Sequence, residues 1–317
     1  MSAEWRAGLR NRGELVGLAF VLASLVVAFS LATDRFFSTA TFRTIANQVP
    51  EAVIVAVGLT FVLVIAGIDL SVGSVLALAS AVLGMAMLRS GAGLLAGSLL
   101  AVLTGLACGA VNGVLTVRFA IPSFIVTLGM LEIARGATYL VTRSQTQYVG
   151  ARVEGLADDF MLGLSLPFLA SVGLVVLGQF VLSRTVFGRY AAAIGTNEEA
   201  VRLAGIDPRP VKVAVFMLAG ALAGIAGIVY TARLGAADPN AGIGFELQAI
   251  AAVVVGGTSL MGGRGSVVGS FLGVLIIAVL GSGLAQAGAQ EPTKRLVTGA
   301  VIVAAVVADA LRRRQGA

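Results

Sequence analysis

Long apolar runs separated by short polar stretches fill the chain from residue 15 onward. A run of about 18 or more apolar residues with few charges has the length at which an α-helix crosses the hydrocarbon core of a bilayer. The pattern therefore predicts an all-α, polytopic membrane protein with about ten spans, at Leu15–Ala32, Val49–Ala66, Ser71–Leu88, Leu94–Val117, Pro122–Val141, Ser165–Ser183, Val213–Thr231, Ala249–Met261, Val267–Gln286 and Leu296–Ala310.

The eighth predicted span, Ala249–Met261, is shorter than the others and is interrupted by glycines. Non-helical backbone at membrane depth is tolerated where protein or a water-filled cavity surrounds it. We therefore expect a broken or partly re-entrant helix here, lining a cavity.

The composition agrees with a membrane protein. Of the 317 residues, 58% are hydrophobic and only 12% are charged, and the mean hydropathy is +0.98. Soluble domains carry about 25% charged residues, so lipid must cover much of this surface. The 41 glycines suit the close approach of helices in a bilayer.

Two residue types are scarce enough to exclude classes of site. The chain has no histidine and a single cysteine, Cys108, which excludes histidine metal sites, a histidine general base and a disulfide framework within one chain. The net charge is +6, but no basic stripe is interleaved with aromatic residues as in single-strand binders. Nucleic acid is therefore not an expected partner, and membrane lipid is.

The basic residues predict the topology. They gather at the N-terminus, between Arg184 and Lys212, and at the C-terminus, and the positive-inside rule places these segments in the cytoplasm. We expect a cytoplasmic tail over 1–14, one transmembrane domain over 15–311 with an inner loop over 184–212, and a cytoplasmic tail over 312–317. The first apolar run exceeds the ~7–15 residues of a secretory signal, so we expect an uncleaved span.

A nucleotide-hydrolysing P-loop is missing from the sequence. That motif needs Gly-x-x-x-x-Gly-Lys-Ser/Thr, because glycine amides and one lysine cradle the phosphates. The chain has only Lys212 and Lys294, and neither lies in such a motif. We expect no enzymatic activity, and any coupling to ATP must come from a partner.

The inner loop contains the signature of one short helix. Thr196 followed by Glu199 is a capping box, and Gly205 is a natural stop with Pro208 beyond it. The pattern predicts a two-turn helix over Asn197–Ala204. So short a helix needs a docking surface, and the residues favour the protein's own helix ends and a cytosolic partner equally.

Two further polar groups stand at or within spans. In Gly67–Ser74, Asp69 or Ser71 is expected to cap the third span, and the alternative is a carboxylate in contact with solute or a partner. Glu132 and Arg135 lie three apart on one face of the fifth span. Charges within a bilayer face protein or a watery path, so we expect a mutual ion pair first and a polar wall as the alternative.

The segment from Gly242 to Ser266 combines dense glycines with polar side chains. Glu246 and Gln248 mark the predicted outer mouth of the eighth span, and Thr258 and Ser259 offer hydroxyls near its inner end. Tight packing through small residues explains the glycines but explains the polar groups less well. Asn47 and Gln48 flank the second span from outside, where a solvated helix start accounts for them.

Several of these segments together resemble a known family. The stretches Ala66–Ser74, Pro122–Met130 with Ala134–Gly136, Gly195–Ile206 and Glu246–Ser266 look, in this order and spacing, like the permease subunit of ribose/xylose/galactose-type ABC importers. The family often has Asp where Gln248 stands, has Asn at the position matched to Ser282, and starts the last span with aromatic residues where Glu291–Arg295 stands here.

The resemblance implies a ten-helix importer fold in the bacterial inner membrane, in a homodimer or a heterodimer with a second permease. It implies a cytosolic ABC ATPase that uses ATP and Mg²⁺, an extracytoplasmic sugar-binding protein, and no cofactor bound by this chain. The loop helix would be the coupling helix on the ATPase, comprising Thr196, Asn197, Glu198, Glu199, Ala200, Val201, Arg202, Leu203, Ala204, Gly205 and Ile206.

The expected function is a monosaccharide path worked by alternating access. The candidate path residues are Asn47, Gln48, Asp69, Ser71, Phe124, Thr127, Glu132, Arg135, Glu246, Gln248, Thr258 and Ser259. The alternatives are a path for another small polar solute, such as a nucleoside or a branched-chain amino acid, and a secondary transporter driven by an ion gradient, which would need ionisable relays at mid-membrane.

Overall fold

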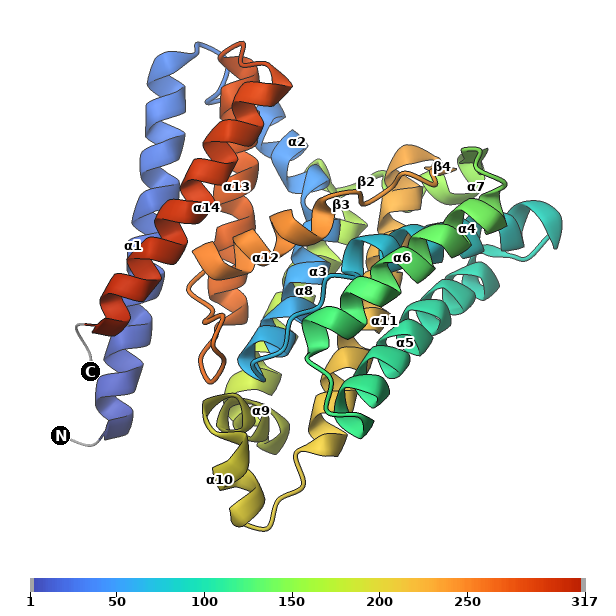
Figure 1. Ribbon diagram of the computed structural model, residues 1–317. Helices are drawn as coiled ribbons and strands as arrows, with labels where there is room; N and C mark the ends of the chain where they lie inside the picture. Colours follow the sequence, from blue (N-terminus) through green and yellow to red (C-terminus); the bar gives the residue numbers. More distant parts are fainter. Residues whose placement is uncertain (1–2, 315–317) are drawn as a thin grey trace.

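A computed structural model describes residues 3–314 and shows an almost entirely helical chain (Figure 1). The elements are α1 (Ala3–Ala32), α2 (Thr39–Gln48), α3 (Pro50–Val64), α4 (Val72–Arg89), α5 (Leu94–Arg118), α6 (Ser123–Thr142), β1 (Gln147–Tyr148), α7 (Ala151–Glu154), β2 (Asp159–Met161), β3 (Leu164–Ser165), α8 (Leu166–Arg184), α9 (Val186–Thr196), α10 (Glu198–Leu203), α11 (Arg209–Leu234), β4 (Ala236–Ala237), α12 (Phe245–Val255), α13 (Val267–Gln286) and α14 (Glu291–Arg314).

The all-α prediction is confirmed, since a helix occupies each of the ten predicted spans. Among the described helices, seven are long and apolar enough to cross a membrane, and the bent pair α2–α3 adds an eighth. The helix predicted to be broken, α12, has 11 residues and ends at Val255, before a loop that leads to α13. The chain is a multi-pass membrane protein.

The second predicted span differs from the expected single helix. Its helical region begins earlier, at Thr39, and bends by 48° between α2 and α3. Pro50 is the first residue of α3, the position where proline is tolerated because its missing N–H needs no intrahelical partner. The apolar pattern does not predict α9 or the short elements between α6 and α8, because these segments lack long apolar runs.

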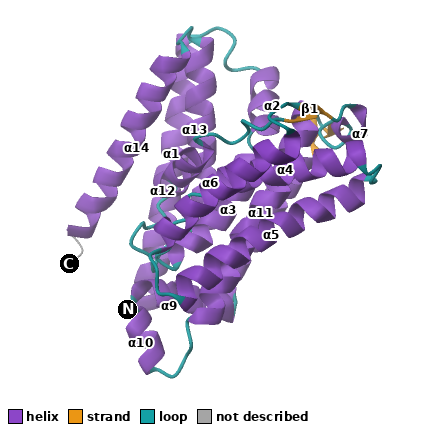
Figure 2. Ribbon diagram, turned by 45° about the vertical axis from the view of Figure 1, so that its right-hand side comes forward, coloured by secondary structure: helices purple, strands orange, loops and turns teal. Residues whose placement is uncertain are grey.

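The helix α11 lies at the centre of the bundle and packs against α3, α4 and α5. The helices α1 and α14 lie at one side, where α1 packs on α13 and α14 contacts α12 and α13 (Figures 1 and 2). The start of α1, the end of α14, and α10 lie at the same end of the bundle (Figure 1).

Glycines let α5 and α11 approach closely. A Cβ atom on Gly220 would lie 2.9 Å from both the Cα and the amide nitrogen of Gly109, and it would collide with the Gly105 carbonyl oxygen. Small residues at helix interfaces permit such backbone contact and replace the hydrophobic driving force that lipid cannot supply. This contact accounts for part of the high glycine content of the chain.

We predict that Gly220→Val lowers the stability of the purified protein by about 1–3 kcal/mol, because added methyl groups must force α5 away from α11. Thermal unfolding in detergent measures the change. Gly173→Val is the matched control, since a Cβ on Gly173 of α8 meets nothing within 4 Å. Equal melting temperatures for the two variants would contradict the close-packing interpretation.

Candidate functional site

The inner loop contains two consecutive helices, and its second helix is capped by Asn197. The Asn197 side chain accepts a hydrogen bond from the Ala200 amide at 2.9 Å. The predicted capping residue, Thr196, is wrong by one position, because α9 extends through Thr196 and its hydroxyl donates to the Ala192 carbonyl. The helix predicted over Asn197–Ala204 is observed over Glu198–Leu203.

The predicted stop after this helix is confirmed. Gly205 has a φ of +81°, a left-handed conformation that glycine adopts without steric cost. Its amide donates to the Arg202 carbonyl at 3.0 Å, and the Ile206 amide donates to the Val201 carbonyl at 3.2 Å. This is the Schellman arrangement, which satisfies the last carbonyls of a helix.

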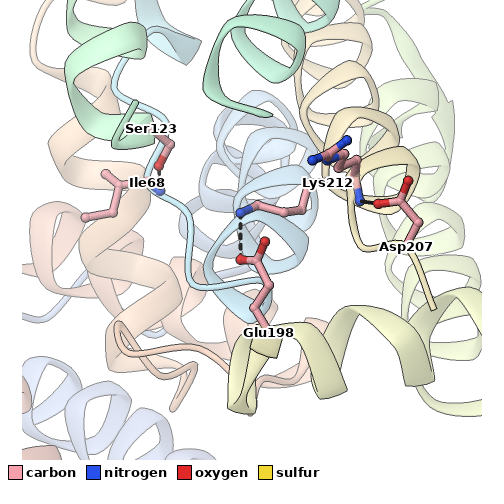
Figure 3. A network of polar contacts seen from close by, with 6 residues as sticks. Ile68, Ser123, Glu198, Asp207 and Lys212 are labelled. Carbon is pink, nitrogen blue, oxygen red and sulfur yellow. Dashed lines mark hydrogen bonds and ion pairs between the residues drawn. The ribbon is translucent and has the colours of Figure 1, made fainter. Parts of the chain in front are cut away.

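The helix α10 docks on its own protein and still presents an outer face. Val201 is buried in the main hydrophobic cluster, whereas Leu203 is 80% exposed. Glu198 pairs with Lys212 at 2.8 Å (Figure 3), and Glu199 pairs with Arg202 at 2.6 Å. The hydrogen bond and charge of Glu199 raise the pKa of Arg202. Because contacts with the rest of the protein fix α10, the exposed side chain of Leu203 offers apolar surface to which a partner can bind.

A cavity of about 720 Å³ separates α10 from the ends of the spanning helices. Its walls are the chain that follows α3, the end of α5, the start of α6, and the segment from α10 to α11. Figure 3 shows the same region, where Glu198 points to Lys212 and Ser123 points to the backbone at Ile68. One side of α10 therefore faces this cavity, while Val201 on another side contacts the main hydrophobic cluster.

The chain between α3 and α4, residues 65–71, is not helical and runs along the start of α6. The Ile68 amide donates to the Ser123 hydroxyl at 2.9 Å, and the Leu70 amide donates to the Thr127 hydroxyl at 3.1 Å. The Thr127 hydroxyl in turn lies 3.2 Å from the Ile68 carbonyl oxygen. Two side chains of α6 thus replace the helical hydrogen bonds that this segment lacks, whereas Phe124 on the same helix is exposed.

Asp69 is the buried end of a short polar chain. Its carboxylate accepts from the Ser71 amide at 2.8 Å and from the Ser71 hydroxyl at 2.6 Å, and the Asn112 amide group donates to that hydroxyl at 3.0 Å. The expected cap of α4 is wrong, because the Ser71 side chain makes no capping hydrogen bond and Asp69 binds the residue before the helix. Asn112 is not among the site residues predicted from the sequence.

The polar face of α5 contributes two buried oxygens to this region. Among the described residues, the Asn112 carbonyl oxygen and the Thr116 hydroxyl are buried without a hydrogen-bond partner. Asn112 and Thr116 lie four apart, on one face of α5, opposite the non-helical segment. An amide side chain within this span, four residues from a threonine, was the signal that could have pointed to Asn112.

The expected ion pair between Glu132 and Arg135 is wrong. In the described part of the chain no ion pair joins them; Arg135 instead donates to the main-chain oxygens of Pro239 and Ala241, at 2.8 and 2.7 Å. This geometry ties α6 to the loop that precedes α12. Glu132, halfway along α6, is exposed at the surface of the single chain.

The polar residues of the 242–266 segment separate into two groups. Glu246 lies against the backbone of Gly73, where a Cβ atom would meet its carboxylate, and Gln248 is exposed. Thr258 and Ser259 are buried, and Thr258 contacts a hydroxyl pair in which Ser270 lies 2.8 Å from Thr60. In this conformation the second group packs α12 and α13 against α3 and does not line an open path.

The expectation of a solvated helix start is wrong for Asn47. Its side chain donates to the Gly163 carbonyl at 3.3 Å and accepts from the Ser165 amide at 2.9 Å, which fixes the β2–β3 hairpin. Asn47 and the exposed Gln48 line a second cavity, of about 590 Å³. Arg233, in the same wall, pairs with the buried Glu51 at 2.6 Å.

The structure therefore does not gather the candidate path residues in one cavity. Asn47 and Gln48 lie at the second cavity. Asp69, Ser71 and Thr127 surround the break between α3 and α4. Glu132 lies on an exposed helix face. In a single chain these residues lie in separate regions and do not enclose one continuous space.

Comparison with known proteins identifies the family. The family model described as the branched-chain amino acid transport system permease component matches residues 41–306. No solved structure is significantly similar to the chain.

The chain is similar to curated permeases over nearly its whole length. It is 39% identical over 313 residues to a ribose import permease protein of Escherichia coli, covering 96% of this chain and 95% of that one. It is 37% identical over 303 residues to a D-allose transport system permease protein of the same species, covering 93% and 91%. It is 34% identical over 318 residues to a fructose import permease protein of Rhizobium meliloti, covering 98% and 88%. The chain belongs to the branched-chain amino acid transport system permease component family.

Proposed function

We propose that the chain is the transmembrane permease subunit of an ABC importer and forms the path for a monosaccharide. The observation that carries this proposal is its similarity, over more than nine-tenths of its own length, to permeases named for ribose, D-allose and fructose. These relatives differ in the sugar but share the class of solute.

The energy would come from a partner ATPase in the cytoplasm. The sequence has no P-loop, and α10 exposes Leu203 beside charged residues at one end of the bundle. That end also carries the start of α1 and the end of α14 (Figure 1), and the basic residues there favour the cytoplasmic side of a bacterial inner membrane. An extracytoplasmic sugar-binding protein would deliver the solute to the opposite end.

The solute path would run along α6, between this chain and a second permease. A carboxylate in the middle of a span is costly in lipid and usually faces water or protein. Glu132 is exposed in the single chain, so a second chain or a watery path must cover it. A homodimer supplies such a cover with the same sequence, and a heterodimer supplies it with a sibling permease.

Transport would follow alternating access without chemistry on the solute. The breaks at 65–71 and 256–266 provide non-helical segments between rigid helices, which is where hinge motion is absorbed. The free energy of ATP binding in the partner would favour one arrangement of these helices, and hydrolysis would return the other.

The test of the function is uptake by the complete transporter in proteoliposomes. We expect labelled ribose or another monosaccharide to accumulate with ATP inside and the binding protein outside, and to continue when ionophores collapse all ion gradients. Uptake that stops with the gradients and ignores ATP would instead identify an ion-coupled secondary transporter. Competition with leucine and with a nucleoside tests the other solute classes.

We predict that Leu203→Glu weakens association with the ATPase about tenfold, because the substitution would bury an unpaired carboxylate in the apolar part of the interface. Co-purification of the two subunits measures it. The control is Leu162→Glu, the same change at a residue that is 78% exposed in the β2–β3 turn. Undiminished association of the Leu203 variant would refute a coupling role for α10.

We predict that Glu132→Leu reduces uptake about tenfold while the complex still assembles, because hydrogen bonds to a charged group contribute about 1.5–3 kcal/mol. Ile133→Leu, at the neighbouring exposed position, is the control. If Glu132 faces lipid, the leucine variant should be more stable and should transport normally. That outcome would contradict the prediction.

A further inference from the structure

Three main-chain segments meet at one point beneath the spanning helices. They are Gly195 near the end of α9, the end of α3 with its exit (Val64–Ala66), and Gly262–Gly263 in the α12–α13 loop; we call this contact the glycine junction. The Gly263 amide donates to the Val64 carbonyl at 2.9 Å. Figure 1 shows α9 and α10 below the end of α3 and the α12–α13 loop.

The glycine junction has no room for side chains. A Cβ atom on Gly262 would lie 2.7 Å from both the Ala66 Cβ and the Gly195 carbonyl oxygen. A Cβ on Gly195 would collide with the Val64 carbonyl oxygen. Since backbone meets backbone here, a shift of one segment must displace the others rather than be absorbed by a change of rotamer.

The coupling loop enters this junction directly. Only Asn197 lies between α9 and α10, and it bonds to both helices: its amide donates to the Ala193 carbonyl at 3.0 Å, and its side chain caps α10. The two helices are therefore held together across this residue. A push on α10 reaches Gly195 and Thr196 at the end of α9.

Beyond the junction lie both breaks in the spanning helices. Ala66, Gly262 and Gly263 have φ values of +59°, +83° and +76°, so the chain turns sharply at each break. The segment after Ala66 carries Asp69 inward and bonds to Ser123 and Thr127 of α6. The loop containing Gly262 and Gly263 leads into α13.

We infer that the glycine junction is the positioning element that passes movement of α10 to α4, α6 and α13 as one unit. The inference rests on the proposed function and adds to it the residues through which coupling acts. Gly195, Gly262 and Gly263 touch no solute in this role. They act by keeping the end of α9 in contact with the two helix breaks, one after α3 and one between α12 and α13.

The main test is Gly195→Ala in the reconstituted transporter, with uptake and ATP hydrolysis measured in the same vesicles. We expect ATP hydrolysis to persist and the solute transported per ATP to fall about tenfold, within the range by which single substitutions alter coupling. Gly173→Ala on α8, where a Cβ meets nothing within 4 Å, should match the unmodified protein. An unchanged ratio in the Gly195 variant overturns the inference.

A cysteine pair separates transmission from simple misfolding. In a Cys108→Ser background, Thr196→Cys and Gly263→Cys place Cβ atoms about 3.3 Å apart, slightly below the ~3.5–4.5 Å found in disulfides. The crowding caused by the added side chains is the same in the oxidised and reduced forms of this variant, so comparing the two forms isolates the effect of the bond. If the junction moves as a unit, the oxidised form should keep uptake within about twofold of its own reduced form. Loss of uptake on oxidation that reductant restores would show that the segments separate during transport, and would overturn the inference.

The two proposals fail in different ways. If the unmodified complex shows neither ATP-dependent uptake nor association with an ATPase, the proposed function fails. If the unmodified complex transports and the Gly195 variant keeps the same uptake per ATP, only the role of the glycine junction fails.

Discussion

Main-chain N–H and C=O groups that leave a helix in a water-poor interior need other hydrogen-bond partners, and each buried group left unpaired costs several kcal/mol. The chain interrupts its helices between α3 and α4 and between α12 and α13. At the first break Ser123 and Thr127 of α6 bind the free amides of Ile68 and Leu70. At the second, the amides of Gly263 and Ser266 find the Val64 carbonyl and the Thr258 hydroxyl.

This requirement explains why polar residues of an apolar protein lie where they do. Thr127 and Thr258 are both buried and serve the backbone first. Asp69 belongs to the same region but differs in carrying a carboxyl group, held by Ser71 and, through it, by Asn112. Some of the residues predicted from the sequence to line a solute path therefore bind the main-chain groups that are left free where the helices are interrupted.

The short helix α10 has two faces with different contacts. A six-residue helix is unstable alone in water, and α10 persists because Asn197 caps it, Gly205 ends it, and Val201 docks on the main hydrophobic cluster. These contacts occupy one face and leave Leu203 outside. The sequence alone left docking on the protein itself and docking on a partner equally favoured; the structure uses one face for the first and leaves the other available for the second.

Apolar run length by itself determined that the chain is a bundle of membrane helices, because hydration of a 20-residue apolar segment is too unfavourable for any other placement. Local chemistry also determined the stop at Gly205, since only left-handed backbone ends that helix in this way. Tertiary structure decided the rest. Whether Arg135 pairs with Glu132 or with the Pro239 and Ala241 carbonyls depends on a loop about a hundred residues away, and no spacing within α6 contains that information. Thr196 and Asn197 are both competent caps, and the choice followed from how far α9 extends. Contacts distant in sequence settle such alternatives because several partners satisfy the same polar group locally, and only packing selects one.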